Sequence, residues 1–318
     1  MKYFVTGGAG FVGSSMVDRL LGMGHEVVAY DNMSTGVEGF LEDAKKNPNF
    51  KLVVGDILDR DFLTESMKGV DFVFHFAANA DIKDNLAHPD YVFTQNAQGT
   101  LSVLEAMRAN GVKKIAFSST GSVYGEPEVF PTPEDAPFPV QTSLYAASKT
   151  FGEGLISSYC EGYGFTGYIF RFVSLLGERY PHGHVFDFVK KLKADPEHLP
   201  ILGDGHQRKS YLYIQDCLDA IFSAINSSDC GVNIFNLGTD EYCEVKDSAG
   251  YIAGKMGLNP EFQYAGGKRG WVGDSPFIFL DTAKIRSTGW TPKLTIKEAI
   301  ERTVDYLLEN PWLYDVRK

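Results

Sequence analysis

The chain has 318 residues, about twice the usual length of a single domain, so one large α/β unit and two packed lobes are both compatible with it. Apolar residues make up 44% and charged residues 22%, which excludes a disordered, collagen-like or membrane-spanning chain. Subtracting 41 acidic from 30 basic residues gives a net charge of −11, and no basic patch offsets it. Nucleic acids and anionic membranes are therefore not expected as partners.

The four cysteines are scattered along the chain, and we interpret them as reduced thiols: Cys160, Cys217, Cys230 and Cys243. No third ligand accompanies His182 and His184, so no metal site is predicted. The N-terminus reaches glycines after one short apolar run, and no apolar stretch approaches the ~18 residues that span a bilayer. We expect a soluble cytoplasmic protein without a signal peptide.

Apolar runs alternate with helical patterns in the first half of the chain, which is typical of parallel β-α-β architecture. Strands are expected at 3–6, 26–30, 51–54, 71–76, 114–117 and 167–172. Helices are expected at 12–21, 59–67, 91–110 and 143–163. A long proline-rich segment at 121–142 favours a functional loop. These elements predict a Rossmann-type, doubly wound parallel sheet.

The pattern changes after residue 172, where shorter helices mix with short strands and loops rich in glycine and proline. These helices are expected at 185–193, 216–227, 245–256 and 296–308. We therefore expect a first domain at 1–172, with the chain returning to it around 210–240. Residues 173–318 are expected to form mainly a smaller α/β lobe that binds the substrate.

A glycine-rich turn, TGGAGFVG, joins the first strand to the first helix and carries Gly7, Gly10 and Gly13. Glycines at this spacing let backbone N–H groups approach a pyrophosphate at a helix N-terminus. Asp31 ends the second strand, where its carboxylate would accept hydrogen bonds from an adenosine ribose and repel a 2′-phosphate. The order of strand, glycines, helix, strand and acid predicts a site for NAD rather than NADP.

A second motif, YAASK, places Tyr145 and Lys149 four residues apart on one face of a helix. A neighbouring ammonium and a bound nicotinamide cation would lower the tyrosine pKa from ~10 toward the working pH. The segment Ser118 to Thr120 ends a strand just upstream, at the carboxyl edge where open α/β sheets bind ligands. His75, at another apolar strand end, is expected to be a structural histidine.

These motifs resemble the nucleotide-sugar epimerase/dehydratase family of extended short-chain dehydrogenase/reductases, and most closely its UDP-glucose 4-epimerase-like members. The resemblance extends over the whole chain and includes GDI at 55–57, HFAA at 75–78, SSTGSVYG at 118–125 and GDG at 203–205. It implies that Thr120, Tyr145 and Lys149 are catalytic. It also implies a homodimer formed through the helices near 91–110 and 143–163.

The resemblance further implies two sets of binding residues. Expected NAD-binding residues are Gly7, Gly10, Phe11, Val12, Gly13, Asp31, Asn32, Ser34, Thr35, Gly36, Asp56, Ile57, Phe76, Ala77, Ala78, Ala80, Asn96, Ser118, Tyr145, Lys149 and Phe172. Expected substrate-binding residues are Thr120, Ser122, Tyr145, Ser174, Val185, Phe186, Arg208, Lys209, Arg269, Asp274 and Ile278.

The chain departs from the family pattern at two of these positions. Lys209 stands where the family usually has an arginine, with Arg208 beside it, so either cation could contact the diphosphate. Ser174 replaces an asparagine that usually contacts the diphosphate. Ile278 stands where similar epimerases carry a residue that limits the size of the sugar, and we hypothesise that the pocket admits an N-acetylated sugar as well.

The reaction is indicated by the residues after Thr120, which are Gly121 and Ser122 where similar dehydratases and decarboxylases carry an acid. Without that acid, 4-epimerisation is favoured: transient oxidation at C4, rotation of the 4-keto sugar and return of the hydride. The expected substrate is UDP-glucose or UDP-galactose. Alternatives are an epimerase or dehydrogenase of another nucleotide sugar (UDP-N-acetylhexosamine, UDP-uronic acid, CDP- or GDP-sugar), or a non-catalytic dinucleotide-sensing regulator. Such a regulator would usually lack the tyrosine or the lysine.

Overall fold

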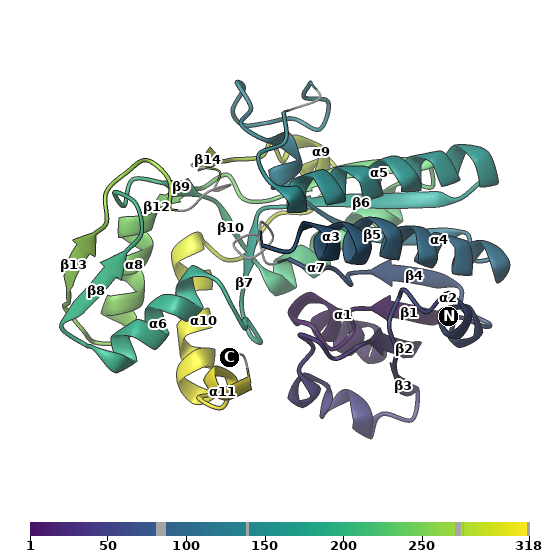
Figure 1. Cartoon of the computed structure of the whole chain (residues 1–318), viewed down its shortest axis with the longest axis horizontal. Helices are drawn as coiled ribbons and strands as arrows, with labels where there is room; N and C mark the ends of the chain where they lie inside the picture. Colours follow the sequence, from purple (N-terminus) through teal and green to yellow (C-terminus); the bar gives the residue numbers. More distant parts are fainter. Residues whose placement is uncertain (81–86, 138–139, 271–274, 276, 317–318) are drawn as a thin grey trace. The chain divides into compact units, whose positions relative to one another are not determined.

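The computed structural model describes residues 1–80, 87–137, 140–270, 275 and 277–316. The chain forms two compact units, coloured by sequence in Figure 1. Unit 1 comprises Met1–Val123, Ser143–Arg171 and Ala224–Phe235. Unit 2 comprises Tyr124–Thr142, Phe172–Ser223 and Asn236–Lys318.

A seven-stranded sheet forms the centre of unit 1, in the order β11-β6-β5-β4-β1-β2-β3. Its strands are β1 (Lys2–Thr6), β2 (Glu26–Asp31), β3 (Phe50–Val54), β4 (Phe72–His75), β5 (Lys114–Thr120), β6 (Thr166–Phe172) and β11 (Val232–Leu237). Strand β1 pairs in parallel with β2 and β4, β2 with β3, and β4 with β5. This arrangement confirms the predicted doubly wound parallel sheet.

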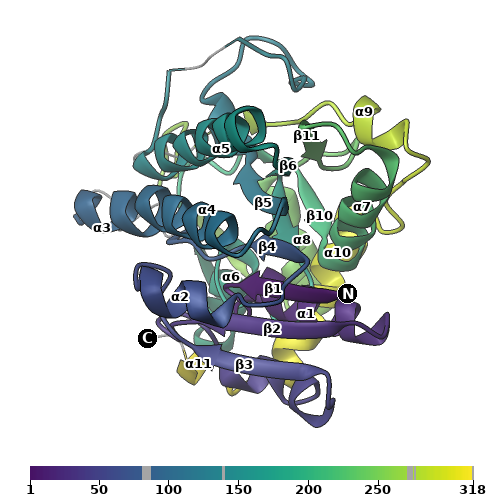
Figure 2. The ribbon, with the colours of Figure 1, turned by 90° about the vertical axis from the view of Figure 1, so that its right-hand side faces the viewer.

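The helices of unit 1 cover both faces of this sheet. They are α1 (Phe11–Gly22), α2 (Arg60–Ser66), α3 (Pro89–Phe93), α4 (Gly99–Ala109) and α5 (Leu144–Tyr163). Figure 2 shows α2, α4 and α5 side by side along one face. The chain moves outward from β1 to β3 in one direction and from β4 to β6 in the other, so right-handed crossovers place α1 on the opposite face. The switch point between β1 and β4 is where such sheets bind ligands.

The core of unit 1 explains why its strands are almost continuously apolar. Phe4, Val73, Ile115, Phe117 and Ile169 come from neighbouring strands, and each is at most 1% exposed within one hydrophobic cluster. Strands covered by helices on both faces have no solvent side on which to place polar residues. Burial of both faces therefore fixes the sheet and, with it, the positions of the loops at its carboxyl edge.

Unit 2 combines small sheets with helices. Its elements are β7 (Ser174–Leu176), α6 (His184–Ala194), β8 (His198–Ile201), β9 (Arg208–Lys209), β10 (Tyr211–Tyr213), β12 (Cys243–Glu244), α8 (Val245–Lys255), β13 (Glu261–Tyr264), β14 (Phe277–Ile278), α9 (Ala283–Arg286), α10 (Ile296–Glu309) and α11 (Leu313–Val316), while α7 (Ile214–Ser227) runs from this unit into unit 1. The sheets have the orders β10-β7, β12-β9-β14 and β13-β8. Helices α6, α8 and α10 pack together (Figure 1).

Helix α10 shows how the sequence of unit 2 dictates its structure. The side chain of Thr295 accepts a hydrogen bond from the Glu298 backbone N–H, and Glu298 reciprocates with the Thr295 N–H, which forms a capping box. Its buried residues recur at the three- and four-residue spacing of an amphipathic helix: Ile296, Ala299, Ile300, Thr303, Val304 and Leu307.

Two differences from the sequence-based expectation matter for the site. Residues 91–110 form α3, a π-helical turn η3 (Thr94–Gln98) and α4 rather than one continuous α-helix. The segment Tyr124–Thr142 belongs to unit 2, although the predicted division at residue 172 placed it in the first domain, whereas Ala224–Phe235 belongs to unit 1 and lies within the predicted return around 210–240. Among the described residues, no helix is long and apolar enough to span a membrane.

Candidate active site

The glycine-rich turn after β1 has the shape that a pyrophosphate site requires. Gly7 has a φ of +67°, and a Cβ there would lie 2.7 Å from the Ala77 backbone nitrogen. A Cβ on Gly13 would collide with the Gly7 carbonyl oxygen, so this glycine allows α1 to approach the turn closely. Gly10 is the N-cap of α1 and has no side-chain cap, and only the Gly7 oxygen, at 3.2 Å, would meet its Cβ. The N-terminal N–H groups of α1 and the space beside Gly10 fit a pyrophosphate. The predicted Phe11 and Val12 open this helix.

Asp31 is fixed at the same edge of the sheet. It ends β2, is 8% exposed, and accepts hydrogen bonds from the backbone N–H groups of Ala9 (2.9 Å) and Met33 (2.8 Å). Burial raises the pKa of its carboxyl group, and the two N–H donors oppose that effect. Gly36 lies so close that a Cβ there would be 2.7 Å from an Asp31 oxygen. The carboxylate is thus held beside the glycine turn, as a ribose diol would need.

Five predicted NAD-binding residues lie after β2 and β3, and hydrogen bonds join three of them. Asn32 donates to the Asp56 carboxylate (2.9 Å), which also accepts the Leu58 N–H (2.9 Å). Ser34 donates its hydroxyl to the Asn32 side-chain oxygen (2.7 Å), Ile57 is 6% exposed, and Thr35 is exposed. The structure therefore brings this predicted group together at the edge of the sheet.

The segment after β4 is held by polar side chains buried beneath it. Ala77 donates its N–H to the Thr6 hydroxyl (3.2 Å), and Thr6 also contacts His75 Nδ1 (2.7 Å). His75 Nε2 contacts Thr100 (3.0 Å), and burial lowers the pKa of this histidine to about 3. Both ring nitrogens have partners, which supports the structural role expected of His75. The predicted Phe76, Ala77 and Ala78 are half-buried, and Ala80 is exposed.

Asn96 lies in the π-helical turn and connects this segment to α5. Its side-chain oxygen accepts the Asn79 N–H (2.7 Å), and its amide donates to the Asn79 carbonyl (3.0 Å) and to Ser148 (2.9 Å). Ser148 in turn donates to the Tyr145 carbonyl (2.8 Å). An extra residue in a helical turn redirects the side chains around it, and π-turns are frequent at functional sites. The predicted cofactor residue Asn96 therefore also orients the start of α5.

The predicted catalytic residues gather where β5 ends and α5 begins. Ser143 caps α5 by accepting the Ala146 N–H (3.1 Å), which fixes the first turn that carries Tyr145. Lys149 is 2% exposed and donates to the Ser118 carbonyl (2.7 Å). Thr120 ends β5, and its hydroxyl oxygen accepts the Ser122 N–H (3.1 Å), so the hydroxyl proton is left to donate elsewhere.

Burial dominates the acid–base properties of this pair. It raises the pKa of Tyr145 to about 12 and lowers the pKa of Lys149 to about 7. The Lys149 ammonium lies 5.9 Å from the centre of the Tyr145 ring and donates to a backbone carbonyl. The loss of solvent around the phenol therefore sets the pKa of Tyr145, and the predicted lowering also depends on a bound nicotinamide cation.

In unit 2 the neighbouring cations Arg208 and Lys209, which the sequence could not distinguish as diphosphate contacts, have different surroundings. Strand β9 places Arg208 opposite Glu244 and Phe277, and Lys209 opposite Cys243 and Ile278. The Arg208 guanidinium lies 3.8 Å from the centre of the Phe277 ring and is exposed. Lys209 donates to the Ser275 carbonyl, and its charge contributes to the lowered pKa of His184. Because neighbouring side chains on a strand point to opposite faces, the two cations face different surroundings.

The other predicted substrate residues are distributed over unit 2. Ser174 is exposed at the start of β7, and Ile278 is half-buried on β14. Val185 and Phe186 on α6 are 0% and 5% exposed, and the Phe186 ring lies 4.8 Å from that of Tyr314. The side chains of these two residues thus pack in the interior.

Three further residues were predicted to bind the substrate or NAD: Arg269, Phe172 and Asp274. Arg269 is exposed and forms an ion pair with Glu126. Phe172 is half-buried at the end of β6, where unit 2 resumes. Asp274 lies outside the described residues.

Sequence reasoning missed four residues of the site in unit 1: Ser119, Ser148, Glu153 and Arg171. Glu153 is 7% exposed and pairs with Arg171 through two hydrogen bonds of 3.0 and 2.7 Å. It also accepts a hydrogen bond from Ser119. One feature of the sequence could have revealed it: Glu153 follows Lys149 by four residues on the helix face that Tyr145 and Lys149 share.

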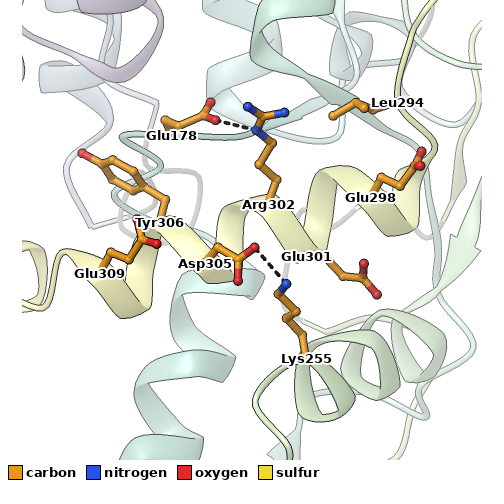
Figure 3. Close-up of a pocket in the computed structure, with 9 residues that line it drawn as sticks. All are labelled: Glu178, Lys255, Leu294, Glu298, Glu301, Arg302, Asp305, Tyr306 and Glu309. Carbon is orange, nitrogen blue, oxygen red and sulfur yellow. Dashed lines mark hydrogen bonds and ion pairs between the residues drawn. The ribbon is translucent and has the colours of Figure 1, made fainter.

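A cavity of about 490 Å³ lies in unit 2 (Figure 3). Five carboxylates, two cations, Tyr306 and Leu294 line it, and none of them is a predicted site residue. The figure shows Arg302 directed at Glu178 and Lys255 at Asp305, in ion pairs of 2.8 Å each. This cavity is therefore not assigned to the predicted chemistry.

Comparisons with known proteins agree with this arrangement. The model of the NAD-dependent epimerase/dehydratase family matches residues 3–238. The UDP-glucose 4-epimerase of Mycolicibacterium smegmatis is 35% identical over 315 residues, covering 96% of this chain and 98% of that protein. A crystal structure of UDP-galactose 4-epimerase is 36% identical, with a TM-score of 0.88 and coverage of 98% and 100%.

A second solved structure shows the range of substrates among the neighbours. The UDP-glucuronic acid 4-epimerase of Bacillus cereus, in complex with UDP-glucuronic acid and NAD, is 26% identical with a TM-score of 0.88 and coverage of 97% and 99%. These matches confirm the family that the motifs indicated, while the neighbours act on different sugars. The chain therefore belongs to the NAD-dependent epimerase/dehydratase family, in which it is an NAD-dependent nucleotide-sugar epimerase, an isomerase.

Proposed function

We propose that this enzyme is a 4-epimerase of UDP-hexoses, interconverting UDP-glucose and UDP-galactose. The observation that carries the proposal is the end of β5, where Thr120 is followed by Gly121 and Ser122. Elimination of water or loss of a carboxyl group needs a further acid or base there, whereas oxidation and reduction at one carbon does not. The curated relative named UDP-glucose 4-epimerase, with 35% identity over nearly the full length, supports the same choice.

The residues at the end of β5 and the start of α5 suit the proton transfer at the sugar 4-OH. Tyr145 as a phenolate removes this proton and later returns it to the same oxygen. Thr120 donates its hydroxyl proton to that oxygen, since its own oxygen already accepts the Ser122 N–H. Lys149 contributes positive charge beside the phenolate. NAD held by the glycine-rich turn and Asp31 would supply the hydride acceptor for C4 and a cationic ring that favours the phenolate.

Rotation of the 4-keto sugar converts this reversible oxidation into epimerisation, so the nucleotide must stay bound while the sugar turns. We propose that Lys209, rather than Arg208, contacts the diphosphate. Arg208 lies over the Phe277 ring, whereas Lys209 is half-buried and its charge reaches His184 at the start of α6. Ser174, Arg269, Asp274 and the backbone at Val185 and Phe186 are proposed as the remaining contacts, with Ile278 beside the sugar.

We also propose that the enzyme is a homodimer, formed through the outer faces of α3, α4 and α5. Tyr91, Phe93 and Phe151 are 45%, 56% and 47% exposed, and the rings of Phe93 and Phe151 lie 6.0 Å apart. Exposed aromatic side chains that gather on one face mark interaction surfaces. Light scattering of the wild type and of Phe151→Glu tests this proposal: a dimer that the substitution dissociates supports it, and a wild-type monomer contradicts it.

The substrate proposal is tested by incubating the purified protein with UDP-, CDP- and GDP-sugars and resolving the products by NMR. Conversion of UDP-galactose to UDP-glucose, well ahead of every other pair, is the expected result. Preferential conversion of a UDP-uronic acid, a UDP-N-acetylhexosamine or a CDP- or GDP-sugar would replace the proposed substrate. No conversion of any sugar would contradict the epimerase itself.

A further inference from the structure

A buried ion pair is connected to the elements that carry the predicted catalytic residues. The side chains of Glu153 and Arg171 are only 9% and 12% exposed, and two hydrogen bonds join the carboxylate of Glu153 to the guanidinium of Arg171. Ion pairs that are buried this deeply lose most of their hydration, so they contribute little net stability and need another reason for their place. Their position relative to β5 and α5 supplies one.

Glu153 connects three elements that carry the site. It lies one helical turn after Lys149 on α5, pairs with Arg171 on β6, and accepts the hydroxyl of Ser119 on β5. Ser119 is 2% exposed and stands between Ser118, whose carbonyl accepts the Lys149 ammonium, and Thr120. A displacement of Ser119 would therefore move both the acceptor of Lys149 and the hydroxyl of Thr120.

We propose that Glu153, held by Arg171 and Ser119, is a positioning residue that fixes the carboxyl end of β5 against α5 and thereby places Lys149 and Thr120 around Tyr145. This inference rests on the proposed epimerase mechanism and adds to it a residue that touches neither substrate nor cofactor. The fork of Arg171 holds both carboxylate oxygens of Glu153, so that the carboxylate cannot rotate away from Ser119.

The charge of Glu153 also affects Lys149. Within the described part of the chain, the ionisable side chains around Lys149 are Tyr145 and Glu153 on α5 and His75 on β4, while Arg171 on β6 faces Glu153. Burial lowers the pKa of Lys149, and Glu153 acts in the opposite direction. Glu153 thus keeps more of this lysine in the ammonium form that the proposed mechanism uses. Removal of the carboxylate charge should lower the pKa of Lys149 further, and an exposed acid on the same helix should have no such effect.

The test compares Glu153→Gln, Arg171→Lys and Ser119→Ala with the wild type and with Glu161→Gln, an exposed acid near the end of α5. Epimerase kcat should fall about 10-fold or more in Glu153→Gln and less in the other two, while KM for the nucleotide sugar changes little, because the substrate contacts are intact. Glu161→Gln should match the wild type. Thermal unfolding of each variant separates loss of fold from loss of positioning.

A second measurement needs no substrate. In protein labelled at lysine 13Cε, the Lys149 resonance, assigned with Lys149→Met, should titrate about one pH unit lower in Glu153→Gln than in the wild type. Wild-type kcat and an unmoved titration in Glu153→Gln would overturn the proposal. If Glu153→Gln does not fold, wild-type kcat in both Ser119→Ala and Arg171→Lys would overturn it. If even the wild type epimerises no sugar, the proposed function fails, and the titration still decides whether Glu153 acts on Lys149.

Discussion

The predicted site residues of unit 1 and unit 2 are held in different ways. In unit 1, Asp31, Asn96 and Lys149 are 8%, 3% and 2% exposed, and each makes hydrogen bonds to backbone groups. In unit 2, Arg208 and Arg269 are exposed, one lying over an aromatic ring and the other paired with Glu126. These three residues of unit 1 are thus fixed by the fold, whereas the two arginines of unit 2 are more accessible.

This difference explains why the reaction type is easier to assign than the substrate. A buried, hydrogen-bonded side chain tolerates few replacements, so the motif that contains it can be recognised in a single sequence. Side chains that are not fully buried can be exchanged at less cost to stability, as the half-buried Lys209 in place of an expected arginine and the exposed Ser174 in place of an expected asparagine illustrate. We therefore expect substitutions in unit 1 to abolish activity and those in unit 2 to shift KM or sugar preference.

The largest effect is expected for Tyr145→Phe, which removes the proposed base and little else. Loss of a general base costs about 10²- to 10⁴-fold in rate, and kcat should fall by this amount while bound NAD is retained. Steady-state kinetics with UDP-galactose and the absorbance of released cofactor measure both quantities. A variant with the wild-type rate would remove Tyr145 from the mechanism.

The second-largest effect is expected for Gly13→Ala, because the added Cβ would collide with the Gly7 carbonyl and push α1 away from the glycine turn. We expect loss of bound NAD and a lower unfolding temperature. Gly22→Ala, at the exposed end of the same helix with no atom within 4 Å of its Cβ, is the matched control. It should retain NAD and be stabilised by about 0.5–1 kcal/mol, since alanine favours the helix. Equal NAD content in both variants would contradict the role given to Gly13.

A smaller and more selective effect is expected from the two neighbouring cations of β9. Lys209→Met should raise KM for UDP-galactose about 10-fold or more with little change in kcat, as expected when a charged contact to substrate is lost. Arg208→Met should stay within about 2-fold of the wild type, because Arg208 lies over Phe277 instead. The reverse order of effects would show that Arg208 holds the diphosphate.

The smallest effect concerns sugar preference. If Ile278 lies beside the sugar, Ile278→Ala enlarges the pocket by about three carbon atoms and should raise kcat/KM for an N-acetylated UDP-sugar by roughly 10-fold relative to UDP-galactose. The ratio of the two specificity constants is the measurement. Equal exclusion of N-acetylated sugars by the wild type and by Ile278→Ala would count against this placement.

The fold and the grouping of the proposed catalytic residues could be predicted because their cause is local. Glycines at fixed spacing, apolar strands and the four-residue spacing of Tyr145 and Lys149 are all visible in the sequence. The π-turn at Thr94–Gln98 could not, because one extra residue in a helix leaves the apolar pattern almost unchanged. The raised pKa of Tyr145 and the partners of Glu153 depend on what the folded chain buries, so no spacing in the sequence encodes them.

The central claim is that the sugar is oxidised and reduced at the same carbon within one active site. The most direct test uses UDP-galactose deuterated at C4, with the purified enzyme and no added NAD, followed by NMR of the product. The account predicts UDP-glucose that retains deuterium at C4. Product that has lost the deuterium to solvent, or accumulation of a stable keto sugar in place of UDP-glucose, would contradict it.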